Sequence, residues 1–92
     1  MAAKLKLSPY TLKHYEPKLA RYIFCNAVTS EFWDTDYITG SVIASLDGLQ
    51  TREEIVEELS FNSPDVSKSE IAEHFNKVFD FLLEEGFIFD GD

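Results

Sequence analysis

The residue types that most often perform chemistry are few in this chain and far apart. The two histidines, His14 and His74, lie near opposite ends of the sequence, and Cys25 is the only cysteine. Structural zinc sites need four nitrogen or sulfur ligands, usually in closely spaced pairs. The sequence therefore predicts no metal site.

The remaining candidates for catalysis have simpler structural interpretations. Cys25 lies in an apolar run and is expected to be a small buried residue and not a nucleophile. Asp34 and Asp36 could act as paired carboxylates in acid–base chemistry, but they precede an expected helix, where carboxylates cap free amides. The 4 glycines are scattered, so no phosphate-binding loop is indicated. We expect no enzymatic activity and no bound cofactor.

The composition fits one small domain covering residues 1–92, and its charge argues against one class of partner. The chain has 17 Asp and Glu against 8 Lys and Arg, a formal net charge of −9. Nucleic-acid binding draws most of its free energy from basic side chains that displace counterions from phosphates. We therefore expect no nucleic-acid partner.

The same sequence indicates a cytoplasmic protein with no membrane partner. No apolar run approaches the roughly 20 residues that cross a bilayer, and the amino-terminal residues lack the apolar stretch of a signal peptide. A single cysteine cannot form an internal disulfide, which agrees with a reducing compartment.

Strands are expected in the first third of the chain. Leu5 and Leu7 alternate with lysines as in a half-buried strand, although residues 1–20 could also form an irregular arm. The run 21–25 is dense in aromatic and β-branched residues, which predicts a strand buried on both faces. Residues 30–33 are expected to be its antiparallel partner. The prediction is a small antiparallel sheet of two or three strands.

Three helices are expected after this sheet. The first covers residues 36–46 and leads into a tight turn at 47–48. Its Gly40 costs about 1 kcal/mol relative to Ala within a helix, which favours a close backbone contact at this position. The second begins at Thr51, because Thr51 and Glu54 have the spacing of a capping box. The third begins at Ser67 and carries the clearest apolar stripe. An antiparallel sheet followed by three helices gives an α+β, winged-helix-like fold class.

The order of these features resembles the PqqD-like family, the small recognition elements of ribosomally synthesised and post-translationally modified peptide pathways. The resemblance covers roughly residues 22–88. It is carried by features in the same order as in the family: an apolar pair (Val42-Ile43), an Asp-Gly turn (Asp47-Gly48), a capping Thr (Thr51), a Glu-Ile pair (Glu54-Ile55) with Leu59 after it, and a Leu-rich helix end (Phe81-Leu82-Leu83) with Gly86 after it.

The resemblance implies a non-catalytic protein that binds the leader of a precursor peptide. In the family, the leader adds as a strand beside the third strand and packs against the third helix. A separate modifying enzyme is implied, often a radical S-adenosylmethionine (SAM) protein, and the specific candidate is a splicease. Carried over by position, the expected peptide-binding residues are Glu31, Phe32, Trp33, Asn76, Val78, Phe79 and Leu82.

Periodicity adds its own expectations for these residues. Phe32 and Trp33 are neighbours on one strand, so their side chains must point to opposite faces. One of them is expected to face the core, and either could line a peptide groove or be covered by the helices. Phe75 and Phe79 are expected core residues of the third helix.

Two other classes of protein remain open. A winged-helix transcriptional regulator would need basic side chains on its third helix, but Lys68 and Lys77 there are outnumbered by acids. An acidic carrier protein is small and helical, and its family attaches a prosthetic arm to Ser in an Asp-Ser-Leu sequence. Ser45 follows Ala44 instead of an acid, and the strand-rich first third does not fit.

Overall fold

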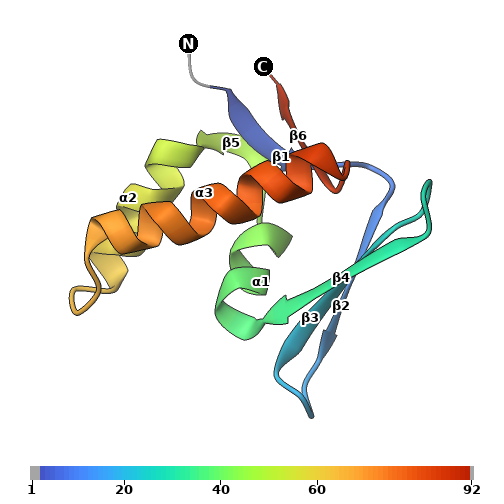
Figure 1. Ribbon diagram of the computed structural model, residues 1–92, viewed down its shortest axis with the longest axis horizontal. Helices are drawn as coiled ribbons and strands as arrows, with labels where there is room; N and C mark the ends of the chain where they lie inside the picture. Colours follow the sequence, from blue (N-terminus) through green and yellow to red (C-terminus); the bar gives the residue numbers. More distant parts are fainter. Residues whose placement is uncertain (1–2, 92) are drawn as a thin grey trace.

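The computed structural model describes residues 3–91, which form two three-stranded antiparallel sheets and three helices (Figure 1). The predicted α+β class, with an antiparallel sheet ahead of three helices, is confirmed. The arrangement is winged-helix-like, with one long helix, α3 (Lys68–Glu84).

The first sheet is a meander of consecutive strands in the order β2-β3-β4. Its strands are β2 (Thr11–Glu16), β3 (Arg21–Asn26) and β4 (Glu31–Asp36). Two tight connections join them, and each contains a non-glycine residue with positive φ, Ala20 at 51° and Ser30 at 64°. The expected hairpin is therefore confirmed, and β4 extends three residues beyond the predicted end at 33.

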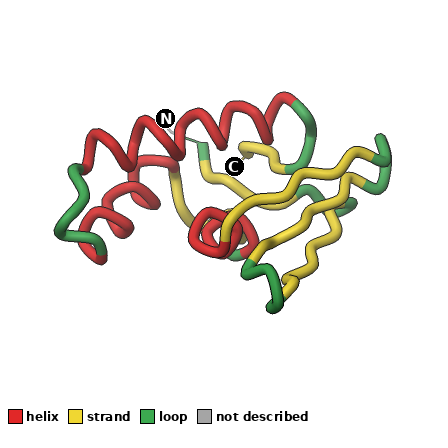
Figure 2. Tube along the Cα trace, turned by 60° about the horizontal axis from the view of Figure 1, so that its bottom comes forward, coloured by secondary structure: helices red, strands yellow, loops and turns green. Residues whose placement is uncertain are grey.

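Only one face of this sheet is covered. Figure 2 shows the helices to one side of the three strands. In β3, Phe24 and Asn26 are buried, whereas Ile23 and Cys25 are half-buried on the opposite face. The prediction of a strand buried on both faces is wrong, and Cys25, expected to be buried, is only half-buried. An antiparallel sheet can leave one face to solvent, so an apolar run does not require cover on both sides.

The second sheet joins the beginning, middle and end of the described chain in the order β5-β1-β6. Its strands are β1 (Lys4–Leu7), β5 (Asp47–Thr51) and β6 (Ile88–Gly91). Residues 47–48, expected to be only a tight turn, begin β5, and Gly48 has φ of +83°. The amino-terminal arm is strand-forming. Both outer strands pair with β1, whose partners are remote in sequence.

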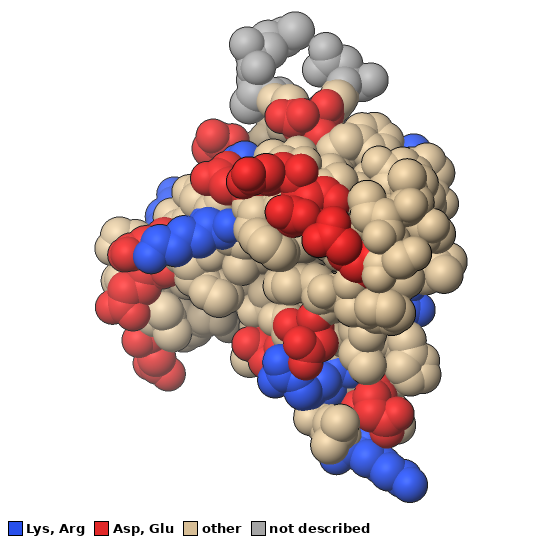
Figure 3. Space-filling view, turned by 45° about the vertical axis from the view of Figure 1, so that its right-hand side comes forward, with Lys and Arg blue, Asp and Glu red and all other residues tan. Residues whose placement is uncertain are grey.

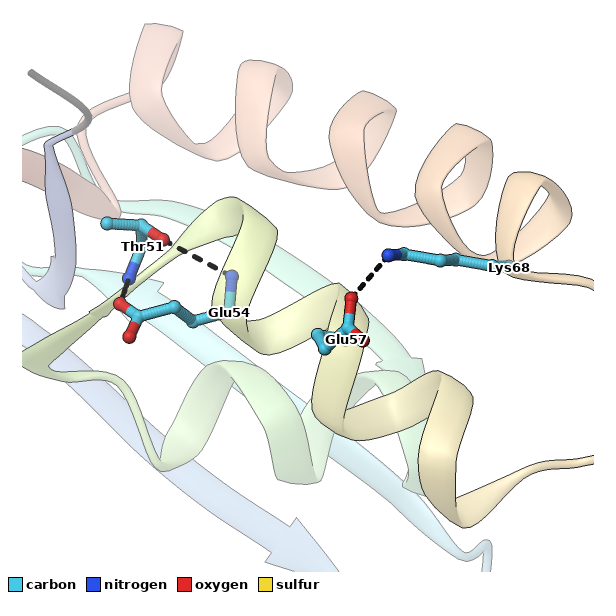
Figure 4. Close-up of polar contacts among 4 residues, drawn as sticks. All are labelled: Thr51, Glu54, Glu57 and Lys68. Carbon is cyan, nitrogen blue, oxygen red and sulfur yellow. Dashed lines mark hydrogen bonds and ion pairs between the residues drawn. The ribbon is translucent and has the colours of Figure 1, made fainter.

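The helices begin where local capping signals predict. They are α1 (Tyr37–Ala44), α2 (Arg52–Asn62) and α3 (Lys68–Glu84). The Asp36 carboxylate accepts from the Thr39 amide at 2.7 Å. Thr51 and Glu54 form the reciprocal capping box, with distances of 3.2 and 2.9 Å (Figure 4). Asp34 does not cap; it forms an ion pair with Arg21 at 3.1 Å.

The core lies between α3 and the two sheets. Its largest fully buried apolar side chains are Leu5, Phe24, Ile43, Phe79, Leu82, Phe87 and Ile88. Gly40 of α1 packs so closely on β3 that an added Cβ would collide with the Cβ of Tyr22. The expected close approach at Gly40 is thus confirmed. No helix within residues 3–91 is long and apolar enough to cross a membrane.

Candidate functional site

In the described part of the chain, the outer edge of β4 is an unpaired strand edge within the predicted site. β4 pairs with β3 along one side, and among the described residues no strand pairs with its other side. An edge strand presents a row of amides and carbonyls that another strand can satisfy. The free edge therefore offers main-chain hydrogen bonds to an extended segment.

Side chains alternate along β4 as the strand period requires. Trp33 points inward, half-buried, with its ring centroid 5.5 Å from that of the buried Phe24. Phe32 points to the uncovered face and is 72% exposed. Glu31 shares the face of Trp33 because the two are separated by one residue. The structure thus resolves which aromatic residue faces the core.

One buried side chain fixes the start of β4 against the end of α3. Asn26 is 1% exposed, and its Nδ2 donates to the Glu85 carbonyl at 3.1 Å. Its Oδ1 accepts from the amides of Val28 and Thr29 at 2.9 and 3.2 Å. The β3–β4 connection is therefore tied to the carboxyl end of α3, and a buried polar group with these partners resists displacement.

A stripe of α3 faces the β4 side of the molecule. His74 Nε2 lies 3.1 Å from Thr39 Oγ1 in α1, and the Glu85 carboxylate lies near that of Glu31. Val78 and Phe81 stand between these two positions at helical spacings of four and three, so they share this side. Val78 is half-buried and Phe81 is 44% exposed. We call four residues the β4 flank: His74, Val78 and Phe81 of α3, and Glu85, which caps its carboxyl end.

The end of the β4 flank is electrostatically negative. Repulsion by the Glu31 carboxylate raises the pKa of Glu85 above its ordinary value, with a smaller contribution from partial desolvation. None of the ion pairs among the described residues includes Glu31 or Glu85. Figure 3 shows a band of acidic side chains across this side of the molecule. The two carboxylates would accept a cation.

The opposite side of α3 is occupied by α2. Arg52 of α2 donates Nη1 to Asn76 Oδ1 at 3.4 Å and pairs through Nη2 with Asp80 at 2.7 Å. Its guanidinium lies 5.8 Å from the centroid of the Phe79 ring. A hollow of about 190 Å³ remains between α2 and α3, and it is lined in part by Asn76. We call Asn76 and Asp80, with Arg52 against them, the α2 flank.

The seven residues expected at the peptide site are thus divided among three places. Glu31, Phe32, Trp33 and Val78 lie on β4 or the β4 flank. Asn76 lies on the α2 flank, because a residue two positions from Val78 is almost on the opposite side of a helix. Phe79 and Leu82 are both 0% exposed, so neither can contact a ligand in this conformation; they are part of the core beneath the flank.

Three exposed or half-buried residues of the β4 flank are not among the predicted peptide-binding residues. These are His74, Phe81 and Glu85. Helical spacing from Val78 groups them on one side, and this signal was present in the sequence. What the sequence does not give is which side of the apolar stripe faces the strand edge. That assignment depends on how α1 and β4 pack against α3.

Comparisons by sequence identify no relatives. No known family model matches the chain, and no curated protein matches it significantly. Evidence of similarity comes from three-dimensional structures alone.

Solved structures share the fold at low sequence identity. TbiB1, solved in complex with the TbiA(beta) leader peptide, matches with a TM-score of 0.74 and 13% identity over 90% of this chain and 93% of its own. A heterocyclase in complex with substrate and cofactor has a TM-score of 0.62 and 21% identity, covering 98% of this chain. The heterocyclase TruD has a TM-score of 0.60 and 22% identity, covering 97% of this chain. The matched regions are only 11% and 12% of the two heterocyclase chains.

Proposed function

We propose that this protein binds the leader of a ribosomally made precursor peptide and presents it to a separate modifying enzyme, with no catalytic activity of its own. The observation that carries this proposal is the free edge of β4 beside the apolar part of the β4 flank. The leader adds as a fourth strand next to β4. Its alternate side chains contact Trp33, Val78 and Phe81.

Strand addition suits the chemistry of this surface. The unpaired backbone of an edge strand supplies hydrogen bonds that do not depend on sequence, and the neighbouring side chains supply selectivity. Val78 and Phe81 are the apolar contacts that α3 can offer beside β4 without unfolding the core. We expect a dissociation constant between micromolar and nanomolar, roughly −8 to −12 kcal/mol of binding free energy.

The structural neighbours support a leader-binding role by analogy of fold. TbiB1 was solved with a leader peptide, and the heterocyclase with a substrate. In the heterocyclases the matched region is a small part of a long chain, whereas TbiB1 is similar to this chain over nearly its full length. We therefore propose that this chain carries leader recognition and that a different chain carries catalysis.

The identity of the modifying enzyme is a separate part of the proposal. The PqqD-like resemblance favours a radical SAM enzyme, and a splicease is the specific candidate. The heterocyclase neighbours make a heterocyclase the second candidate. Reconstituting each enzyme with the precursor, with and without this protein, distinguishes them. The true partner modifies its precursor faster when the protein is present, and no change with either enzyme contradicts both assignments.

The test of the binding mode uses proline at two successive positions of β4. Successive amides along a strand point to opposite sides, so Asp34→Pro and Thr35→Pro remove one amide toward β3 and one toward the free edge. Proline is tolerated only where the lost amide faces outward. The variant that keeps its melting temperature should therefore bind the leader at least about tenfold more weakly.

Alanine variants at the same positions provide the matched control. Asp34→Ala and Thr35→Ala change the side chains, including the Asp34–Arg21 ion pair, but keep both amides. They should bind the leader normally in a calorimetric titration. Undiminished binding by the folded proline variant would show that the leader does not pair with β4.

A further inference from the structure

The register of an added strand determines which residues of the leader meet which residues of β4. A residue directly opposite a β4 position points to the same face of the sheet, and its Cβ atom lies about 4.5–5.5 Å from that of its partner. Glu31 and Trp33 share the inward face. A bound strand therefore places one inward side chain opposite Glu31 and another, two residues along, opposite Trp33.

The position opposite Glu31 has an unusual concentration of negative charge. The Glu85 carboxylate comes from the end of α3 and lies near that of Glu31. Asn26 holds both residues in place: it is the register partner of Glu31 in β3–β4, and its Nδ2 donates to the Glu85 carbonyl. This buried asparagine therefore holds the backbones of the two acidic residues close together.

The helix end strengthens the same field. Glu85 is the C-cap of α3, where the carbonyl groups leave a partial negative charge. A Lys or Arg in the last turn commonly offsets this charge, but the last turn of α3 has no basic residue. Among the described residues, the ion pairs leave both carboxylates without a basic partner. A bound segment with a basic side chain would supply the cation that this end lacks.

We propose that the bound leader carries a lysine or arginine opposite Glu31 and an apolar residue opposite Trp33. This proposal rests on the proposed function and specifies its substrate class. Glu31 and Glu85 select the basic residue and set the register of the strand. Trp33, Val78 and Phe81 select the apolar one. The basic side chain can extend its aliphatic stem over the apolar surface while its charged end reaches the acids.

A displayed library of random peptides of about 12 residues, long enough to pair with all of β4, tests the pattern. Selection on the wild-type protein should enrich a Lys or Arg two residues from an apolar residue. The same selection on the Glu31→Gln/Glu85→Gln variant should keep the apolar preference and lose the basic one. A Glu53→Gln/Asp65→Asn variant removes the same formal charge from α2 and the following loop, and it should enrich the same peptides as the wild type.

Individual peptides give the quantitative result. A selected peptide is synthesised with Lys, Gln or Glu at the enriched position. On the wild type and on the control variant, the Lys peptide should bind at least about tenfold more tightly than the Glu peptide. On the Glu31→Gln/Glu85→Gln variant, the three peptides should agree within about twofold. Thermal unfolding verifies that each variant is folded.

The outcomes separate this proposal from the proposed function. Two outcomes overturn the charge selection alone, provided that the peptides still require the β4 edge. In one, the peptides show no preference for a basic residue on the wild type; in the other, they keep that preference on the Glu31→Gln/Glu85→Gln variant. Selected peptides that bind the folded β4 proline variant as tightly as the wild type overturn strand addition itself. A library that yields no binder overturns both proposals.

Discussion

The two sides of α3 differ in how completely the protein covers them. On the α2 flank, Arg52 bonds Asn76, pairs with Asp80 and lies over the ring of Phe79. A second ion pair joins Lys68, at the start of α3, to Glu57 of α2 (Figure 4). On the β4 flank, Phe81 is 44% exposed and Glu85 has no basic partner among the described ion pairs.

The difference shows where a partner can bind without displacing an ion pair within the protein. A ligand on the α2 flank would have to compete with Arg52 for the same polar groups. A ligand between β4 and the β4 flank would instead form hydrogen bonds with backbone groups of β4 that are solvated in the free protein. It would also cover apolar area that is already exposed. The same helix thus has a side used for folding and a side available for binding.

The largest expected effect comes from removing the side chain on which both flanks rest. Phe79→Ala should lower the free energy of unfolding by about 3–5 kcal/mol, because it deletes a fully buried aromatic ring and leaves a cavity. Urea denaturation measures this change. Phe81→Ala on the same helix is the control and should cost far less stability. Similar losses for both variants would mean that Phe81 is also part of the core.

The next prediction compares leader binding by variants on the two flanks of α3. Phe81→Ala should weaken leader binding by about tenfold, or about 1.4 kcal/mol, because it removes exposed apolar area beside β4. Asn76→Ala should leave binding unchanged, since Asn76 is on the α2 flank. Calorimetric titration of both variants decides between the sides. The reverse pattern would move the site to the hollow between α2 and α3.

A smaller effect concerns the start of α2. Thr51→Ala should lower the free energy of unfolding by about 1 kcal/mol, because the Glu54 amide loses its acceptor. The Thr51 amide donates to the Glu54 carboxylate and lowers the pKa of Glu54, so the stabilisation from this contact is present above the ordinary pKa and is lost as pH falls through the lowered one. Thr51→Ala keeps this amide, so Glu54→Gln is the variant whose stability difference from the wild type should shrink in acid. An equal difference at all pH values would contradict the capping box.

The smallest effect is a pH dependence at Glu85. Its pKa is raised in the folded protein, so between the ordinary and the raised pKa the folded state binds more protons than the unfolded state. Stability should therefore fall as pH rises through this window and then level off. Glu85→Gln should remove this part of the fall, whereas Glu73→Gln, elsewhere on α3, should keep it. Chemical denaturation across mildly acidic pH gives the comparison.

Features set by neighbouring residues could be predicted from the sequence. The capping box at Thr51 and Glu54 depends on residues three apart, and the apolar stripe of α3 follows from helical spacing. The close approach at Gly40 was expected from a glycine within an apolar helix. In each case the physical cause lies within one or two turns of chain.

Features that depend on residues remote in the sequence could not be predicted. β5 forms because residues 47–51 pair with β1, and β1 also pairs with β6 from the end of the described chain. Nothing near Asp47 indicates that pairing. The placement of the candidate site residues on the two sides of α3 could not be predicted for the same reason. Periodicity groups Val78 with Phe81 and separates both from Asn76, but only tertiary packing shows which group lies beside β4.

Amide hydrogen exchange with a leader segment bound tests the central claim most directly. If the leader adds as a strand, exchange at the outward-pointing amides of β4 slows on binding, while amides of α2 near Arg52 exchange as before. The effect should alternate along residues 31–36, because only every second amide faces the added strand. Slowed exchange between α2 and α3, with β4 unchanged, would contradict the account.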